Sequence, residues 1–317
     1  MQPLETTTIG SFPLEPSPEN IRICARIQAE AGIDYPAVPQ LEDFCMLFLK
    51  RMRGLRIEGD RVILEDLIEP GEISEIMDQV SETISELERH DVKGVKAQIT
   101  GPVTLGSIVE AGEAPLIQYP DLYETLVETL CEIARRICDF TPIKVVFIDE
   151  PAIPGALWAG VQEDLIISSV NRVVEAIRGR GKVAGMHVCG RIVEYDHIFL
   201  KTGVTILHHE YKGTPDNIQA YSRRVIEETG KMVGIGCVKS KPEDTVVRVE
   251  DVSEVLETIV TAAGKYGAKN IILAPDCGFA PLKHVLPRDE AIDVVRRKLE
   301  KMVEAAGKAR KMLIEGD

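Results

Sequence analysis

Short apolar runs alternate with stretches of helical periodicity along almost the whole chain. Each run is rich in β-branched residues and ends in Gly, Pro, Asp, His or Cys. The runs are Thr7–Phe12, Asp34–Val38, Val95–Thr100, Lys144–Asp149, Val183–Val188, Val204–His209, Met232–Cys237 and Asn270–Pro275. We interpret these eight runs as strands, because eight parallel strands are the number that closes a (β/α)₈ barrel.

The stretches between the runs have the pattern of amphipathic helices. Within Glu72–Arg89, apolar residues recur at helical spacing and therefore share one face. Similar stretches are Leu122–Phe140, Leu165–Arg178, Asp216–Thr229, Val252–Tyr266 and Asp289–Met312. Continuous apolar strands that alternate with helices are typical of a parallel sheet covered on both faces. A doubly wound open sheet is the alternative, but eight units and the lack of an early Gly-x-Gly-x-x-Gly motif favour the barrel.

Composition narrows the class of protein further. No linker or low-complexity segment divides the chain, so we predict a single α/β TIM-barrel domain over residues 1–317. The net charge of −14 argues against a nucleic-acid partner, and no apolar run is long enough to span a membrane. The N-terminus lacks the pattern of a secretion signal, and the seven cysteines are an odd number, typical of reduced thiols. We therefore expect a cytoplasmic protein.

Polar and metal-binding residue types follow the predicted strands at the point where each strand ends. They are Ser11, Gln40, Thr100, Asp149, Glu150, His187, Cys189, His209, Glu210, Cys237, Asp276 and Cys277. In a barrel, the carboxyl ends of all strands open on one rim, and enzymes of this fold carry out their chemistry there. Residues that are remote in sequence are therefore expected to converge.

Four of these residues form a set suited to zinc. His187 and Cys189 are two positions apart on an extended strand, so their side chains point to the same face. Glu210 ends the next strand and Cys277 follows the last one. Zinc accepts a tetrahedral set of nitrogen, sulfur and carboxylate ligands, whereas thiolates disfavour magnesium and calcium. The pattern predicts one zinc ion at the rim.

Other ligands are open at this point. Cys237 ends the seventh predicted strand on the same rim and is the alternative ligand. His209 is also a candidate, but neighbours on a strand point to opposite faces, so only one of His209 and Glu210 is expected to reach the ion. Cys45 is ambiguous. The cysteines within helical stretches, which we expect to be packing residues, are Cys24, Cys131 and Cys138.

The same residues belong to a series of motifs with a familiar order. The motifs are Thr7–Pro13, Thr100–Thr104, Asp149–Ala152, His187–Cys189, the region of Glu210, and Pro275–Gly278. In order and spacing, over nearly the whole chain, they resemble the catalytic barrel of cobalamin-independent methionine synthase. The resemblance implies that His187, Cys189, Glu210 and Cys277 bind zinc. It also implies that Ile9, Ser11 and Asp149 hold the carboxylate and amino groups of homocysteine.

The chain also departs from the full-length members of that family. Those enzymes carry a second, N-terminal barrel, for which this sequence has no counterpart. They carry a folate-stacking Trp after the Thr-Gly-Pro-Val-Thr motif, where this chain has Leu105–Ile108, and its one Trp is Trp158. They carry a proton-donating His after the seventh strand, where Cys237–Pro242 contains none. In place of their amino-group-binding Glu, the expected substitutes are Gln40 and Glu42.

These departures lead to a specific expectation about the reaction. The chain resembles the short "core" methionine synthases, so we expect a methyl group to pass from methylcobalamin or a methylated corrinoid protein to homocysteine. Zinc would hold the sulfur as a thiolate, with Glu210 or a water expected to give way to it and Asp149 binding the amino group. The alternatives are a corrinoid-dependent transfer to another thiol such as coenzyme M, on a uroporphyrinogen decarboxylase-like barrel, a folate-using methionine synthase, and a structural metal-binding barrel.

Overall fold

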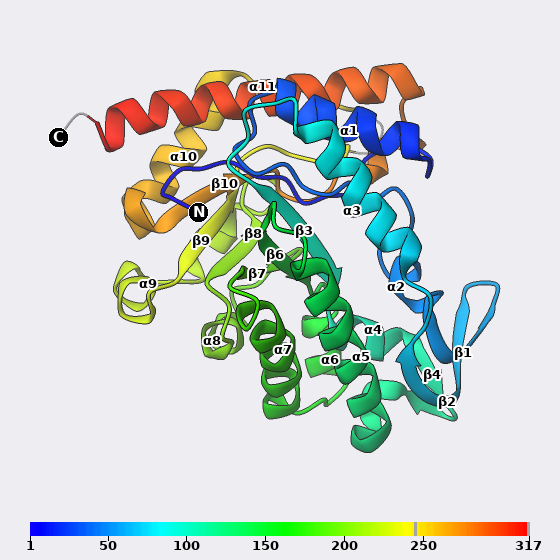
Figure 1. Ribbon diagram of the computed structural model, residues 1–317. Helices are drawn as coiled ribbons and strands as arrows, with labels where there is room; N and C mark the ends of the chain where they lie inside the picture. The colour runs from blue at the N-terminus through cyan, green and yellow to red at the C-terminus, as the bar shows by residue number, and fades with distance from the viewer. Residues whose placement is uncertain (244–245, 316–317) are drawn as a thin grey trace.

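Six parallel strands form the main sheet of the computed structural model, which describes residues 1–243 and 246–315 (Figure 1). In chain order they are β3 (Val95–Thr100), β6 (Ile143–Asp149), β7 (Val183–Val188), β8 (Ile206–Glu210), β9 (Met232–Gly236) and β10 (Ile271–Ala274). Their order across the sheet is β10-β9-β8-β7-β6-β3, so each strand after β3 lies beside the one that precedes it in this series. This succession is what a barrel built from βα units produces.

Two N-terminal segments close the ring. Thr6 forms a parallel bridge with Leu273 of β10, and Thr7 forms another with Tyr35. Ala37 then bridges to Lys96 of β3. The eight parallel segments of the predicted barrel are therefore all present. The first two are joined by isolated bridges rather than by regular strand pairing: Thr7–Tyr35 and Ser11–Gln40 join them to each other, and one bridge joins each to its outer neighbour.

Helices cover the outside of the ring. The longer ones are α1 (Pro18–Glu30), α3 (Ser74–Leu87), α5 (Pro120–Cys138), α7 (Glu163–Arg178), α10 (Val252–Tyr266) and α11 (Arg288–Leu313). The shorter ones are α2 (Met46–Leu49), α4 (Pro102–Ile108), α6 (Ile153–Trp158), α8 (Asp196–Lys201) and α9 (Arg223–Thr229). Local sequence sets several boundaries: Ser17 caps α1 ahead of Pro18, and Asp251 and Glu254 form a capping box at the start of α10.

One helix prediction is wrong in its extent. The segment expected as a single helix over Asp216–Thr229 is divided into a 3₁₀ turn, Pro215–Gln219, and the helix α9. Between them, Tyr221 turns inward and its hydroxyl lies 2.8 Å from Nε2 of the buried His209. Ser222 then caps α9 by accepting a hydrogen bond from the backbone of Val225. Tertiary packing of one tyrosine therefore overrides a helical pattern.

A second sheet was not predicted. The strands β1 (Met52–Glu58) and β2 (Arg61–Pro70) form a hairpin, which is extended by β4 (Val109–Ala111) and β5 (Ala114–Pro115). The hairpin turns at Gly59 and Asp60, and Gly59 has a positive φ of 61°. A Gly-Asp pair between two strand-like runs is a hairpin signal, but the many charged residues of these strands obscure it.

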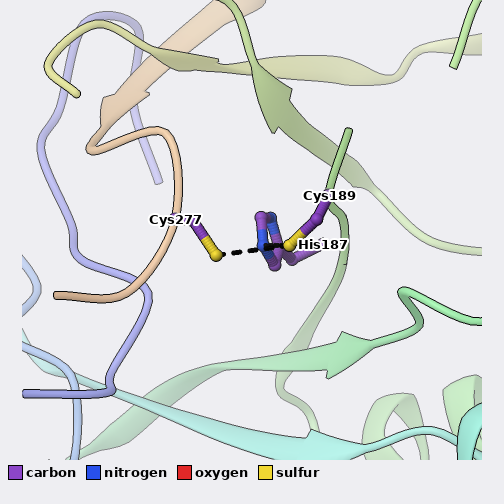
Figure 2. Close-up of side chains that lie close together, drawn as sticks. All are labelled: His187, Cys189 and Cys277. Carbon is purple, nitrogen blue, oxygen red and sulfur yellow. Dashed lines mark hydrogen bonds between the residues drawn. The ribbon is translucent and has the colours of Figure 1, made fainter. Parts of the chain in front are cut away.

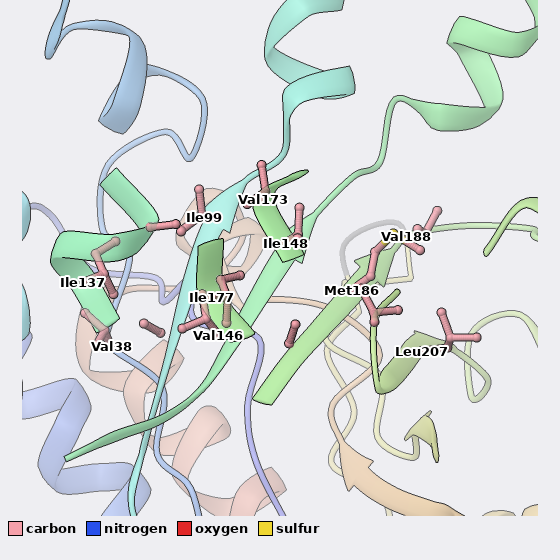
Figure 3. Packing of buried hydrophobic residues seen from close by; sticks show 14 of the residues in the cluster. Val38, Ile99, Ile137, Val146, Ile148, Val173, Ile177, Met186, Val188 and Leu207 are labelled. Carbon is pink, nitrogen blue, oxygen red and sulfur yellow. The ribbon is translucent and has the colours of Figure 1, made fainter. Parts of the chain in front are cut away.

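Alternation along the strands separates two apolar clusters. Outward residues such as Ile99, Ile148 and Met186 belong to a large cluster that also includes Ile137 of α5 and Ile177 of α7 (Figure 3). The residues of a smaller cluster are Val145, Phe147, Ile206 and Ile272, which occupy the alternate strand positions. The smaller cluster therefore fills the barrel interior below the rim. Within the described residues, no helix is long and apolar enough to cross a membrane.

Candidate metal centre and substrate cavity

The inward rows of three neighbouring strands end in the residues of the candidate site. Along β6 the row runs from Phe147 to Asp149, and along β7 it continues past His187 to Cys189 just beyond the strand. Along β8 the equivalent row ends at Glu210. Because side chains two positions apart on a strand share a face, these rows bring Asp149, Cys189 and Glu210 to the same end of the barrel.

His187, Cys189 and Cys277 meet at one point above the barrel interior (Figure 2). Their ligand atoms all lie within 4.8 Å of one another. The His187 Nε2 atom is 2.9 Å from Cys189 Sγ, which is 3.2 Å from Cys277 Sγ. The chain segments after β7 and β10, remote in sequence, thus place one nitrogen and two sulfur atoms around a common position.

The two thiols have opposite proton affinities. The hydrogen bond from Cys189 holds the pKa of Cys277 well below its usual range, although burial opposes this, and His187 adds to the effect. The same hydrogen bond, together with burial, raises the pKa of Cys189. Burial lowers the pKa of His187, but its hydrogen bond and charge interaction with Cys277 more than offset this and raise it overall. The three groups are therefore coupled, and the direction of the shifts favours loss of the Cys277 proton before that of Cys189.

Glu210 lies beside this cluster but outside the group of three. Its Oε1 atom accepts a hydrogen bond from Lys241 Nζ at 2.5 Å, and its Oε2 atom is 3.4 Å from the hydroxyl of Thr214. Glu210 is buried, whereas the side chain of Lys241 is half exposed. Lys241 was not singled out in the sequence, although it lies in the segment that departs from the family pattern. Its charge lowers the pKa of Cys277.

A cavity of about 400 Å³ opens next to the three ligand atoms. It is lined by every residue that the sequence predicts to bind substrate, namely Ile9, Ser11, Gln40, Glu42 and Asp149. A larger cavity of about 490 Å³ borders Lys241 but contains none of the three clustered residues. The smaller cavity is therefore the one in which a ligand could reach the cluster.

Two polar atoms at the smaller cavity are buried and have no hydrogen-bond partner within the described part of the chain. They are Oδ1 of Asp149 and Nε2 of Gln40. Burial raises the pKa of Asp149 to about 6, although the charges of His187 and Lys96 oppose the shift. The carboxylate is therefore ionised at neutral pH. One acceptor and one donor are left for a ligand, because buried polar groups normally have partners.

The other expected substrate residues differ in how many of their hydrogen-bonding groups already have partners within the protein. Ser11 lines the cavity, and its backbone carbonyl accepts a hydrogen bond from Phe279. The carbonyl of Ile9 accepts a hydrogen bond from Lys96. This lysine is buried in the barrel interior and was not predicted from the sequence as a site residue. Glu42 forms ion pairs with Lys50 and Arg51, so its carboxylate already has two partners.

The alternative ligands lie elsewhere. The Cys237 thiol donates to the carbonyl of Ala274, 3.4 Å away, and burial raises its pKa. His209 faces outward from β8, where its two ring nitrogens contact Val188 and Tyr221. The alternation rule therefore holds for His209 and Glu210. It also identifies His208, two positions before Glu210, as an inward residue that the sequence reading overlooked.

Comparisons with known proteins identify the family of the chain and its fold. The sequence model described as the catalytic domain of cobalamin-independent synthase matches residues 52–308. A methionine synthase from Methanothermobacter thermautotrophicus is 28% identical over 95% of this chain and 99% of its own length. The structure of a B12-independent methionine synthase from Shewanella sp., in complex with selenomethionine, has a TM-score of 0.73, 17% identity and 99% coverage of both chains. A putative vitamin-B12-independent methionine synthase from Listeria monocytogenes has a TM-score of 0.67, 18% identity and coverage of 97% of this chain and 98% of its own. The fold prediction is confirmed.

The expected methyl donor is wrong. The matching family is cobalamin-independent, which conflicts with methylcobalamin or a methylated corrinoid protein as donor or partner. The same conflict removes the corrinoid-dependent transfer to coenzyme M. The expectation depended on residues that the chain lacks, the Trp after Thr100–Thr104 and the His near Cys237–Pro242. The absence of these two side chains shows which interactions with a methyl donor the protein cannot make. It does not identify the methyl donor that the protein uses.

Proposed function

The chain belongs to the family of cobalamin-independent synthase catalytic domains, and is thus a methyltransferase of the methionine synthase type. On this premise we propose that it methylates the thiol of homocysteine to form methionine, with residues 1–317 as one catalytic domain. We further propose that His187, Cys189, Glu210 and Cys277 hold one zinc ion. The observation that carries the proposal is the group of three ligand atoms at the edge of the smaller cavity.

The donor set fits zinc. One imidazole nitrogen and two thiol sulfurs are ligands that zinc prefers, and three such ligands with further positions available are typical of a catalytic site. The hydrogen bond from Cys189 and the charge of His187 lower the pKa of Cys277, which favours the thiolate form that a zinc ligand needs. When bound, zinc lowers the pKa of a coordinated thiol, so that the substrate sulfur is a thiolate at neutral pH.

Glu210 is the proposed ligand that yields to the substrate sulfur. Its carboxylate has an alternative partner in Lys241, whose Nζ atom is 2.5 Å away. The two cysteines and His187, by contrast, are held on a strand end and a short loop with their ligand atoms directed at one another. Because Lys241 can hold the carboxylate after it leaves the ion, Glu210 would be easier to displace than the two thiolates or the imidazole nitrogen.

The cavity matches the polar groups of an amino acid. Asp149 Oδ1 is a buried acceptor without a partner and would accept a hydrogen bond from the substrate ammonium. Gln40 Nε2 is a buried donor without a partner and would donate to the carboxylate, with the Ser11 hydroxyl and the backbone of Ile9 beside it. Glu42 would contribute charge at the entrance while it remains paired with Lys50 and Arg51.

A titration that needs no methyl donor tests this proposal. The protein is loaded with cobalt in place of zinc, and homocysteine is added while the thiolate-to-cobalt charge-transfer absorption is recorded. We expect the absorption to rise as the substrate sulfur binds the metal. Homoserine, which has a hydroxyl in place of the thiol, is the matched control and should not raise it. No change with homocysteine would contradict the proposed acceptor, and failure to bind zinc or cobalt would contradict the metal centre.

A further inference from the structure

The ring of His187 has a partner on its far side that belongs to no expected ligand set. The Nδ1 atom of His187 lies 2.8 Å from the Nδ1 atom of His208, and the two ring centroids are 4.9 Å apart. His187 is 2% exposed and His208 is fully buried, so neither ring can exchange this partner for bulk water. The contact joins β7 and β8 inside the barrel, directly below the candidate metal centre.

The surroundings of His208 hold its ring in place. Phe147 packs on it with a centroid separation of 6.3 Å. On the neighbouring strand, a Cβ atom at Gly234 would lie 2.8 Å from the Cβ of His208, so only glycine leaves room for the histidine there. The inward position of His208 follows from its spacing of two residues from Glu210.

The proposed binding of a metal ion by His187 determines which of the two ring nitrogens donates. Two ring nitrogens 2.8 Å apart need one hydrogen between them, with one ring as donor and the other as acceptor. The other nitrogen of His187, Nε2, faces Cys189 Sγ at 2.9 Å and must present a lone pair there to bind a metal ion. The proton of the neutral His187 ring is then on Nδ1, which donates to His208.

From this we infer that His208 is a positioning residue, which accepts the Nδ1–H of His187 and so fixes the tautomer and ring orientation that direct Nε2 at the two sulfurs. Metal-binding histidines usually donate their second ring N–H to a carboxylate, a carbonyl or water, and here a second imidazole takes that place. The inference rests on the proposed metal centre and adds a residue that does not contact the ion or the substrate.

Two nearly isosteric variants test the inference. Asn keeps an acceptor close to the position of His208 Nδ1, whereas Leu has the same shape without one. We expect zinc affinity, measured by chelator competition, to fall about 10- to 100-fold in His208→Leu and to be largely retained in His208→Asn. The absorption bands of the cobalt-loaded protein, which report ligand geometry, should shift in the Leu variant alone. If His208→Leu does not fold, His208→Gln is used in its place. The amide of Gln lies one bond further from the backbone than that of Asn and so leaves no acceptor at the position of His208 Nδ1.

The neighbouring histidine provides a matched control. His209 is equally buried on the same strand but faces Tyr221, so His209→Leu should lower stability while leaving zinc affinity unchanged. Equal zinc affinity in His208→Leu and His208→Asn, or an equal loss in His209→Leu, would overturn the role of His208 alone. A wild-type chain that binds no zinc would instead overturn the metal centre, and this inference with it.

Discussion

The two ends of the barrel differ in how completely their carboxylates are hydrogen-bonded and ion-paired within the chain. At the end where the strands begin, Asp34 accepts hydrogen bonds from the backbone and hydroxyl of Thr6 and pairs with Lys93 and Arg310. At the opposite rim, Asp149 is more deeply buried than Asp34 but has an oxygen with no partner within the described residues. The Asp34 carboxylate thus has its partners within the chain, whereas the Asp149 carboxylate keeps one oxygen available for a ligand.

The pKa directions follow the same division. Burial raises the pKa of Asp34, but the hydrogen bonds from Lys93 and Thr6 and the charge of Arg310 together hold it below its usual value. At the rim, burial raises the pKa of Asp149 to about 6, with too few partners to reverse the shift. Paired charges therefore stabilise the fold at one end, whereas the other end keeps polar atoms available for binding.

The largest expected effect concerns the metal centre at the rim. Replacing Cys277 by Ala removes one of three clustered ligand atoms, so bound zinc should be lost and methyl transfer should fall at least about 1,000-fold, or ~4 kcal/mol. Metal content is measured by elemental analysis, and unfolding of the metal-free protein by urea titration. Since the Cys277 side chain takes part in none of the ion pairs that the described residues form at the rim, the urea midpoint of the metal-free protein should change little. Full zinc content in the variant would show that Cys277 is not a ligand.

A smaller effect is expected for Asp149 at the substrate cavity. Asp149→Asn should weaken homocysteine binding about 10- to 150-fold, equivalent to losing a charge-assisted hydrogen bond of ~1.5–3 kcal/mol. Zinc content should stay unchanged. The cobalt titration measures the dissociation constants of homocysteine and of 2-mercaptoethanol, which has no amino group and should be insensitive to the change. Equal weakening of both thiols would mean that Asp149 does not bind the ammonium.

The smallest effect should appear at the other end and on stability alone. Asp34→Asn weakens pairing with Lys93 and Arg310, so the free energy of unfolding at pH 7 should fall by about 1–3 kcal/mol, limited by the partial exposure of both cations. Homocysteine and zinc binding should be unaffected. A loss of zinc binding in this variant would break the proposed division between the two ends.

The effect of Asp34→Asn on stability should depend on pH. Because the pKa of Asp34 is lower in the folded state, its contribution to stability is present above its ordinary value of 3.8 and is lost as the pH falls through the folded pKa. Urea midpoints of wild type and Asp34→Asn should therefore differ most near neutrality and converge below about pH 4. A constant difference down to pH 3 would assign the stability to the shape of the side chain rather than its charge.

Local periodicity in the sequence determined much of this molecule. Apolar runs predicted β3 and β7 with their observed bounds, and α10 likewise. The spacing of two residues between His187 and Cys189 predicted a shared face, and order along the chain predicted that Cys277 would join them. These features depend on neighbours along one strand or helix, and the repeating geometry of the backbone carries them directly from sequence.

Only the tertiary structure decided contacts between strands. It joined the first two segments to the barrel by single bridges, paired Glu210 with Lys241, and set His208 against His187. Such contacts depend on the register of neighbouring strands and on the paths of the loops, where a shift of one residue would turn His209 inward in place of His208. No periodicity within a single segment contains that information, because it arises from how separate segments pack.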